Sequence, residues 1–100
     1  MPDVRSIAEK VRSKNAGPFW VTIDIFCGSK GPYDRISAGL NLQAIAERFD
    51  TSAALIKRFD LPNLHVIKIS VPRPQVQGTP ADRDMHGAAW AALVAELEVV

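Results

Sequence analysis

The sequence predicts an α+β fold: a two-layer sandwich in which a mainly antiparallel sheet carries helices on one face. Two kinds of periodicity predict it, an alternation with a period of two residues for strands and apolar stripes with a helical period. Helical stripes occur in residues 32–50 and 82–100. Strand patterns occur at residues 6–13, 20–27, 54–61 and 64–71. The resulting order, ββαββα, fits a ferredoxin-like plait or a related arrangement.

The first two strands differ in clarity. In "SIAEKVRS", residues 6–13, Ile7, Glu9 and Val11 alternate with Ala8, Lys10 and Arg12. This period of two residues favours a strand over a single helical turn capped by Asp3. "WVTIDIFC", residues 20–27, is rich in β-branched and aromatic residues and gives the strongest pattern in the chain. One predicted face carries Val21, Ile23, Ile25 and Cys27, and the other carries Trp20, Thr22, Asp24 and Phe26.

The middle of the chain predicts a turn and an interrupted helix. "GSKGP", residues 28–32, has the glycines and proline of a turn. The helix that follows is expected to break near Gly39 and to restart after an Asn41 cap. Its apolar stripe consists of Leu42, Ile45, Ala46 and Phe49.

The second half predicts an antiparallel strand pair and a last helix. A short connection at Pro62 and Asn63 separates the strands. Residues 72–82 have the proline content of a surface loop, and Asp82 or Asp84 can cap the helix that follows. "LEVV", residues 97–100, is expected to leave this helix as a terminal strand. One face of the helix is formed by His86, Trp90, Leu93 or Val94, and Leu97.

Size and composition limit the functional classes. One hundred residues with 47% apolar and 23% charged side chains predict one globular domain over residues 1–100. A net charge of +1 argues against nucleic acid as a partner. Cys27 is the only cysteine, which excludes an internal disulfide and a multi-cysteine zinc site. Without a secretory signal or a long apolar run, we expect a cytoplasmic protein that does not span a membrane.

A polar segment before the strongest strand is the first candidate site. Arg12, Ser13, Lys14 and Asn15 offer charged and neutral hydrogen-bond donors, and Gly17 allows close approach of the backbone. These groups suit a carboxylate or a phosphate. The alternative is a solvated turn whose residues only permit its shape.

Asp24 is the second candidate, because a carboxylate in the middle of a strand requires a hydrogen bond, a cation or water. The alternative is a sheet face that is open to water. Trp20 and Phe26 on the same predicted face favour coverage by another protein chain. Trp90 is a third candidate interface residue.

"DRDMH", residues 82–86, is the third candidate. Asp82, Asp84 and His86 carry carboxylate and imidazole groups that suit several divalent ions. The spacing matches no recognised metal motif, and an aspartate at a helix start commonly caps the helix. We therefore expect neither a metal nor another cofactor here.

Several longer motifs resemble a bacterial family, the domain of unknown function 4387. The residues that carry the resemblance are "VRSKNAGPF", "VTIDIF", "SVPRPQVQGTPADRDMHGA" and "LEV". The family is similar in turn to the C-terminal ferredoxin-fold domain of AtuA-type (acyclic terpene utilisation) proteins, and "RFDLPNLHVIKI" resembles two strands of that domain. The chain departs from the family pattern at His86, where the family has an aromatic residue, and at "AAWA", residues 88–91, where the family has a Gln-Gln-His run.

The resemblance implies a small partner subunit, because family members are typically encoded beside, or fused to, a larger AtuA-like chain. In this interpretation Arg12, Ser13, Lys14 and Asn15 bind a small anionic substrate, and Arg73 and Asp82 lie at the edge of the site. Two alternatives stay open. One is a homo-oligomeric hydratase, lyase or isomerase that uses Asp24, Asp84 or His86 as acid or base. The other is a module that only binds a small anion.

Overall fold

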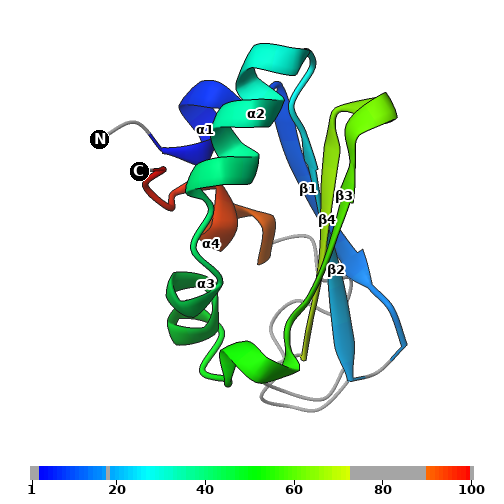
Figure 1. The fold of residues 1–100 in the computed structure, drawn as a ribbon. Helices are drawn as coiled ribbons and strands as arrows, with labels where there is room; N and C mark the ends of the chain where they lie inside the picture. Colours follow the sequence, from blue (N-terminus) through cyan, green and yellow to red (C-terminus); the bar gives the residue numbers. More distant parts are fainter. Residues whose placement is uncertain (1–2, 18, 73–89, 100) are drawn as a thin grey trace.

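The computed structural model describes residues 3–17, 19–72 and 90–99. One four-stranded sheet and a layer of helices make up this part of the chain (Figure 1). The elements in chain order are α1 (Val4–Ile7), β1 (Lys10–Asn15), β2 (Trp20–Phe26), α2 (Lys30–Gly39), α3 (Leu42–Arg48), the 3-10 turn η1 (Ala53–Leu55), β3 (Lys57–Leu61), the 3-10 turn η2 (Pro62–Leu64), β4 (Val66–Pro72) and α4 (Trp90–Ala95).

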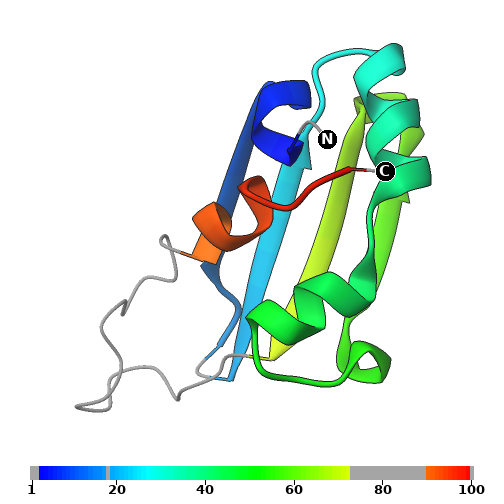
Figure 2. The same cartoon turned by 90° about the vertical axis from the view of Figure 1, so that its left-hand side faces the viewer.

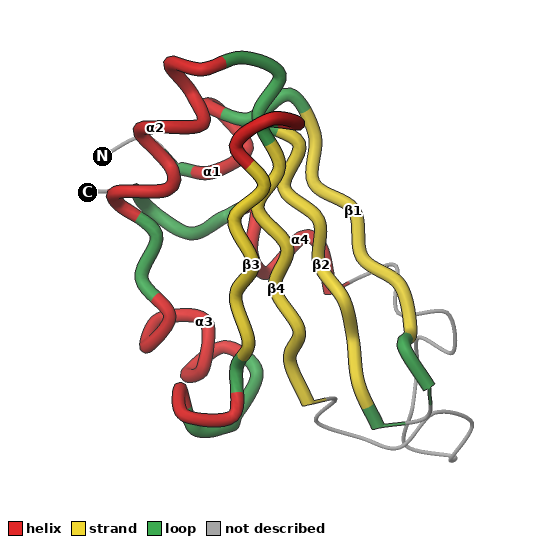
Figure 3. The backbone as a smooth tube through the Cα atoms, turned by 45° about the vertical axis from the view of Figure 1, so that its right-hand side comes forward, coloured by secondary structure: helices red, strands yellow, loops and turns green. Residues whose placement is uncertain are grey.

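The sheet is antiparallel throughout, with the strand order β1-β2-β4-β3 (Figure 3). Since β4 runs antiparallel to both of its neighbours, β2 and β3 are parallel and are separated by β4. The connection from β2 to β3 passes through α2 and α3, which makes a split βαβ unit. The predicted α+β class and the two-layer sandwich are confirmed.

The described helices cover only one face of the sheet, as Figure 2 shows from the helix side. The core lies between this layer and the inward-facing residues of the two central strands. Val21, Ile23 and Ile25 of β2 are fully buried there. The core residues contributed by the rest of the chain include Ile67, Ile69 and Val71 of β4, Ile36, Ile45 and Phe49 of the α2–α3 segment, and Val4, Val94 and Val99 near the two ends.

The interrupted helix is confirmed, and its second part is capped as the sequence predicts. The Asn41 side chain accepts hydrogen bonds from the backbone N–H groups of Gln43 at 2.9 Å and Ala44 at 3.3 Å. The predicted turn over residues 28–32 was wrong in its second half, because α2 already begins at Lys30. Gly28 makes the actual turn. Its φ is +88°, and a Cβ there would lie 2.8 Å from Glu9 Oε2.

The N-terminal prediction was wrong in its first half. Residues Val4–Ile7 form α1 in place of a strand, because the Asp3 side chain accepts a hydrogen bond from the Ser6 N–H at 2.9 Å. This hydrogen bond also lowers the pKa of Asp3. The strand starts at Lys10 and continues to Asn15, so it includes most of the segment expected to be a polar turn.

The antiparallel pair β3 and β4 and its short connection at Pro62–Leu64 are confirmed. The expected terminal strand is reduced to a single bridge between Asp3 and Glu98. Beside it, the Val4 N–H donates to the Leu97 carbonyl at 2.8 Å. The first and last described segments of the chain therefore lie side by side on the helix face (Figure 2).

Candidate functional site

The face of the sheet opposite the described helices is the main candidate surface, and we call it the open sheet face. Its residues follow from the strand registers and the alternating burial. They are Lys10, Arg12 and Lys14 of β1, Trp20, Thr22, Asp24 and Phe26 of β2, Val66, Lys68, Ser70 and Pro72 of β4, and Lys57, Phe59 and Leu61 of β3.

The charge on the open sheet face is strongly asymmetric. Five of these side chains are lysine or arginine and one, Asp24, is acidic. The +1 net charge of the sequence conceals this asymmetry, because it averages over both layers. The face therefore presents a positive potential to an approaching molecule.

Aromatic rings lie among these cations. The Lys10 ammonium is 4.9 Å from the Phe26 ring centroid, and the Lys57 ammonium is 5.6 Å from the Trp20 centroid. Phe59 is 53% exposed. Trp20 and Phe26 thus lie on the face where the sequence predicts an interface. Trp90 is the first residue of α4, and the structure describes only its backbone.

The polar segment singled out in the sequence is not a turn. Arg12, Ser13, Lys14 and Asn15 are consecutive residues of β1, so their side chains alternate between the two faces. Arg12 and Lys14 lie on the open sheet face, and Ser13 and Asn15 lie on the helix side. One ligand on either face cannot contact all four side chains.

Ser13 has a structural contact on the helix side. Its Oγ accepts a hydrogen bond from the Ala91 N–H at 2.8 Å, which joins β1 to α4 across 78 residues of sequence. The actual turn comes after Asn15. There the Ala16 N–H donates to the Trp20 carbonyl at 2.9 Å, and Gly17 adopts a φ of +81°.

Asp24 lies between two cations of the open sheet face. Arg12 stands directly opposite it on β1, and Lys68 stands opposite it on β4. The Lys68 Nζ is 3.4 Å from Asp24 Oδ1, and the Asp24 side chain is 18% exposed. Oδ1 itself is buried and accepts no hydrogen bond from the described residues, so the Lys68 contact is an ion pair without hydrogen-bond geometry.

Asp24 is therefore placed to neutralise cations. A nearby cation is one of the three kinds of partner that the sequence leads us to expect for this carboxylate. Arg12 and Lys68 thus stand on either side of one negative charge.

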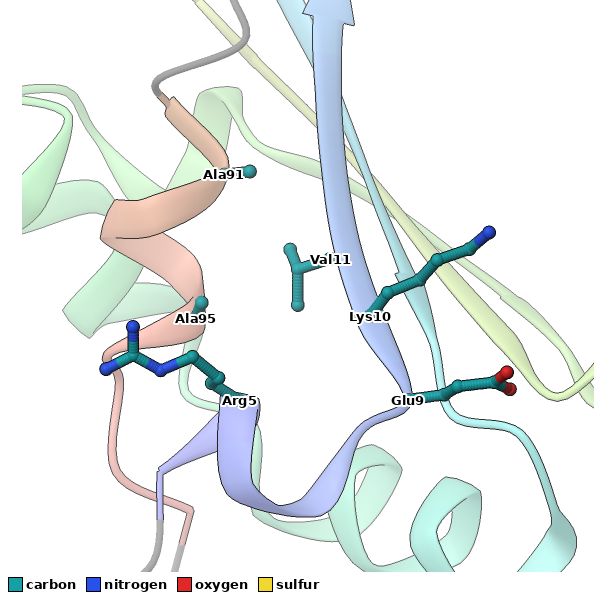
Figure 4. Close-up of a pocket in the computed structure, with 6 residues that line it drawn as sticks. All are labelled: Arg5, Glu9, Lys10, Val11, Ala91 and Ala95. Carbon is teal, nitrogen blue, oxygen red and sulfur yellow. The ribbon is translucent and has the colours of Figure 1, made fainter.

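A pocket of about 300 Å³ lies elsewhere, beside the edge strand β1. Figure 4 shows Val11 pointing toward α4, where Ala91 and Ala95 leave space because their side chains are small. Arg5, Glu9 and Lys10 also line it. Of the predicted site residues that the structure describes, none lines this pocket.

Cys27 lies on the helix side, the same side as Val21 and Ile23, and is 3% exposed. Its N–H donates to the His65 carbonyl at 2.9 Å, and burial raises the pKa of its thiol. The His65 ring lies 6.1 Å from the Tyr33 ring. Burial, followed by the charge of Asp60, raises the pKa of Tyr33. These groups form a packed unit at the end of the sheet.

The remaining predicted site residues, Arg73, Asp82, Asp84 and His86, lie outside the described residues. Among the residues that are described, no group of three or more His, Cys, Asp or Glu side chains is arranged to hold a metal ion. None of the described helices is long and apolar enough to cross a membrane.

Sequence reasoning missed four polar residues of the open sheet face: Thr22, Lys57, Lys68 and Ser70. Each occupies an outward position in its strand. The alternation along β2, β3 and β4 was the sequence pattern from which this outward position could have been predicted. Their proximity to Lys14 and Asp24 depends on the register of three strands, which no local pattern supplies.

Comparison with known proteins identifies the family of this small α+β domain. The family model of the domain of unknown function DUF4387 matches residues 4–98, and the chain therefore belongs to that family. No curated protein and no solved structure gives a significant match.

Proposed function

We propose that this protein is the small subunit of a complex with a larger AtuA-like chain, and that its open sheet face completes a shared site for a small anionic substrate. Arg12 and Lys14 neutralise the anion, and Asp24 keeps the neighbouring cations in position. The larger chain supplies an acidic and apolar docking surface. The proposed reaction of the complex is that of a hydro-lyase or isomerase.

The charge and aromatic content of the open sheet face is the observation that carries this proposal. Five cations against one acid favour an acidic partner through electrostatic complementarity. Trp20, Phe26 and the exposed Phe59 supply the aromatic side chains that commonly anchor protein interfaces.

A second copy of the same chain fits this face poorly. Two open sheet faces stacked on each other would bring ten cations together with only two Asp24 carboxylates, twice the five and one of a single face. Like charges in an interface are strongly unfavourable. A partner with a different surface is therefore the better match.

Co-expression with the AtuA-like chain of the same source, followed by native mass spectrometry, tests the proposal. We expect a stoichiometric complex, because a complementary surface of the larger chain would cover the aromatic residues. The double variant Arg12→Glu and Lys14→Glu should weaken it at least about tenfold, since it reverses two charges in the interface.

Lys30→Glu is the matched control, because Lys30 lies on α2 and its side chain is 82% exposed. It should change the affinity less than about twofold, as expected for a charge outside the interface. Recovery of a stable homo-oligomer that ignores the larger chain would reject the subunit proposal and favour an independent enzyme or binding module.

A further inference from the structure

We propose that the anion is a phosphate group, and that it binds on the hydroxyls of Thr22 and Ser70 between the ammonium groups of Lys14 and Lys57. We call these four residues the phosphate row. The inference rests on the proposed function only in placing a small anion on the open sheet face. It does not require the larger chain for its test.

The register places the two hydroxyl residues next to each other. Thr22 of β2 stands directly opposite Ser70 of β4, on the open sheet face. Just beyond the last pair of this ladder, Phe26 and Val66, the Cys27 N–H donates to the His65 carbonyl at 2.9 Å, so the next position along is hydrogen-bonded. Pairs alternate along an antiparallel ladder, so Thr22 and Ser70 form a non-hydrogen-bonded pair, in which the side chains approach most closely.

Lysines flank this pair on both outer strands. Lys14 of β1 stands opposite Thr22, and Lys57 of β3 stands opposite Ser70. The four side chains therefore form one continuous line across the sheet, in the order Lys14, Thr22, Ser70 and Lys57. Neighbouring strands are about 4.8 Å apart, so both flexible lysines can reach a ligand on the central hydroxyls.

The position of Lys57 supports this convergence. Its ammonium lies 5.6 Å from the centroid of Trp20, a residue of β2 that pairs with Pro72. Since β4 separates β3 from β2, the Lys57 side chain extends inward across the sheet, toward the strand that carries Thr22. It is thereby held near the row without an acidic partner among the described residues.

The nearest carboxylate of the open sheet face does not oppose an anion. Asp24 belongs to the adjacent line of residues, in which Arg12 and Lys68 flank it. Its ion pair with Lys68, at 3.4 Å, offsets its charge. An anion on the phosphate row therefore meets a net positive field.

The donor set favours phosphate over carboxylate. Two ammonium groups and two hydroxyls offer donors from both sides of the ligand. A phosphate group carries close to two negative charges and three acceptor oxygens at neutral pH, and it can use both lysines and both hydroxyls. A carboxylate has one charge and two oxygens, so it leaves part of this set unused.

NMR titration of the protein with inorganic phosphate at constant ionic strength tests the inference. We expect saturable shifts at the amides of Thr22 and Ser70, with a dissociation constant of about 1 to 10 mM for so exposed a site. Acetate should bind at least about tenfold more weakly, because it has half the charge.

Variants identify the groups involved. Lys14→Gln and Lys57→Gln should each weaken phosphate binding about three- to tenfold, as the loss of one charge-assisted contact predicts. Thr22→Val and Ser70→Ala leave the net charge unchanged, and each should weaken binding about threefold through the loss of a hydroxyl donor.

Lys10→Gln is the matched control. Lys10 lies on the same face and also sits over an aromatic ring, that of Phe26, but it is two lines away from the phosphate row. Its removal should change the dissociation constant less than about twofold, since ionic screening weakens its effect over that distance.

Three results would overturn the inference. One is the absence of saturation up to about 100 mM phosphate, well above the expected constant. The second is an effect of Lys10→Gln equal to that of Lys57→Gln, which would indicate general attraction by the whole face. The third is unchanged binding by both Thr22→Val and Ser70→Ala.

The failure of the two proposals can be told apart. If the protein binds phosphate but forms no complex, only the subunit proposal is rejected. If it forms the complex but fails the phosphate tests, only the phosphate row is rejected.

Discussion

The ammonium of Lys57 lies 5.6 Å from the centre of the Trp20 ring, although β4 separates the strands to which the two residues belong. This contact orders a long side chain over the sheet. Trp20→Leu should remove the ring-current upfield shift of the Lys57 ε-methylene protons and leave those of Lys10 over Phe26 unchanged. Lys57→Met should cost about 0.5 kcal/mol of unfolding free energy, as expected for an exposed cation–ring contact. Lys57 signals that do not respond to Trp20→Leu would contradict this geometry.

Ser13 holds α4 against β1 through its contact with the Ala91 N–H. Ser13→Ala should lower the unfolding free energy by about 1 kcal/mol, because the backbone donor loses its acceptor. Urea denaturation measures the change, and Ser13→Thr, which keeps the hydroxyl, is the control. Since Ser13 lies on the helix side, Ser13→Ala should leave phosphate affinity unchanged, and a loss of affinity at unchanged stability would show that its role was assigned wrongly.

Asp24 offsets repulsion among the cations beside it. Asp24→Asn should destabilise the fold by about 1 kcal/mol, since it leaves Arg12 and Lys68 without the charge between them. The cost should shrink as the NaCl concentration rises, because salt screens the repulsion. A double-mutant cycle with Lys68→Met isolates the ion pair. A more stable Asp24→Asn protein would exclude this function of the carboxylate.

Cys27 makes stability depend on pH above neutrality. Burial raises the pKa of its folded-state thiol above the ordinary value of 9.0. A group with a raised pKa contributes its full stability below the unfolded-state pKa, and that contribution falls as the pH rises through the folded-state pKa. Unfolding free energies measured from pH 8 upward should fall more steeply for the wild type than for Cys27→Ala. Parallel curves would show that the thiol ionises equally in both states.

The sequence predicted the central strands better than the edge. β2 was recognisable because Val21, Ile23 and Ile25 alternate with polar and aromatic residues across a core boundary. β1 was recognised only as far as residue 13, and its last two residues, Lys14 and Asn15, were assigned to a polar segment, because every second residue from Lys10 to Lys14 is a cation that faces solvent. An edge strand buries little, so its alternation of charged and small polar residues resembles the composition of a loop.

The candidate site was predictable only in part. Arg12, Lys14, Asp24 and the aromatic residues of β2 stand on the surface that the sequence singles out. The pairing of Thr22 with Ser70 was not predictable, because it joins residues far apart in the chain. A register shift of one residue would turn one of them toward the core, and only the folded sheet fixes that register.

The contact between the Val4 N–H and the Leu97 carbonyl nearly closes the chain into a ring. If residues 3 and 98 were joined by a short linker and the backbone were opened at the turn between β1 and β2, the elements would read βαββαβ, the order of a ferredoxin-like plait. The domain is thus related to that plait by circular permutation. Such a permutant should keep the same core and the same cationic surface. Its new ends should lie at the end of the sheet where β1 and β2 are now joined.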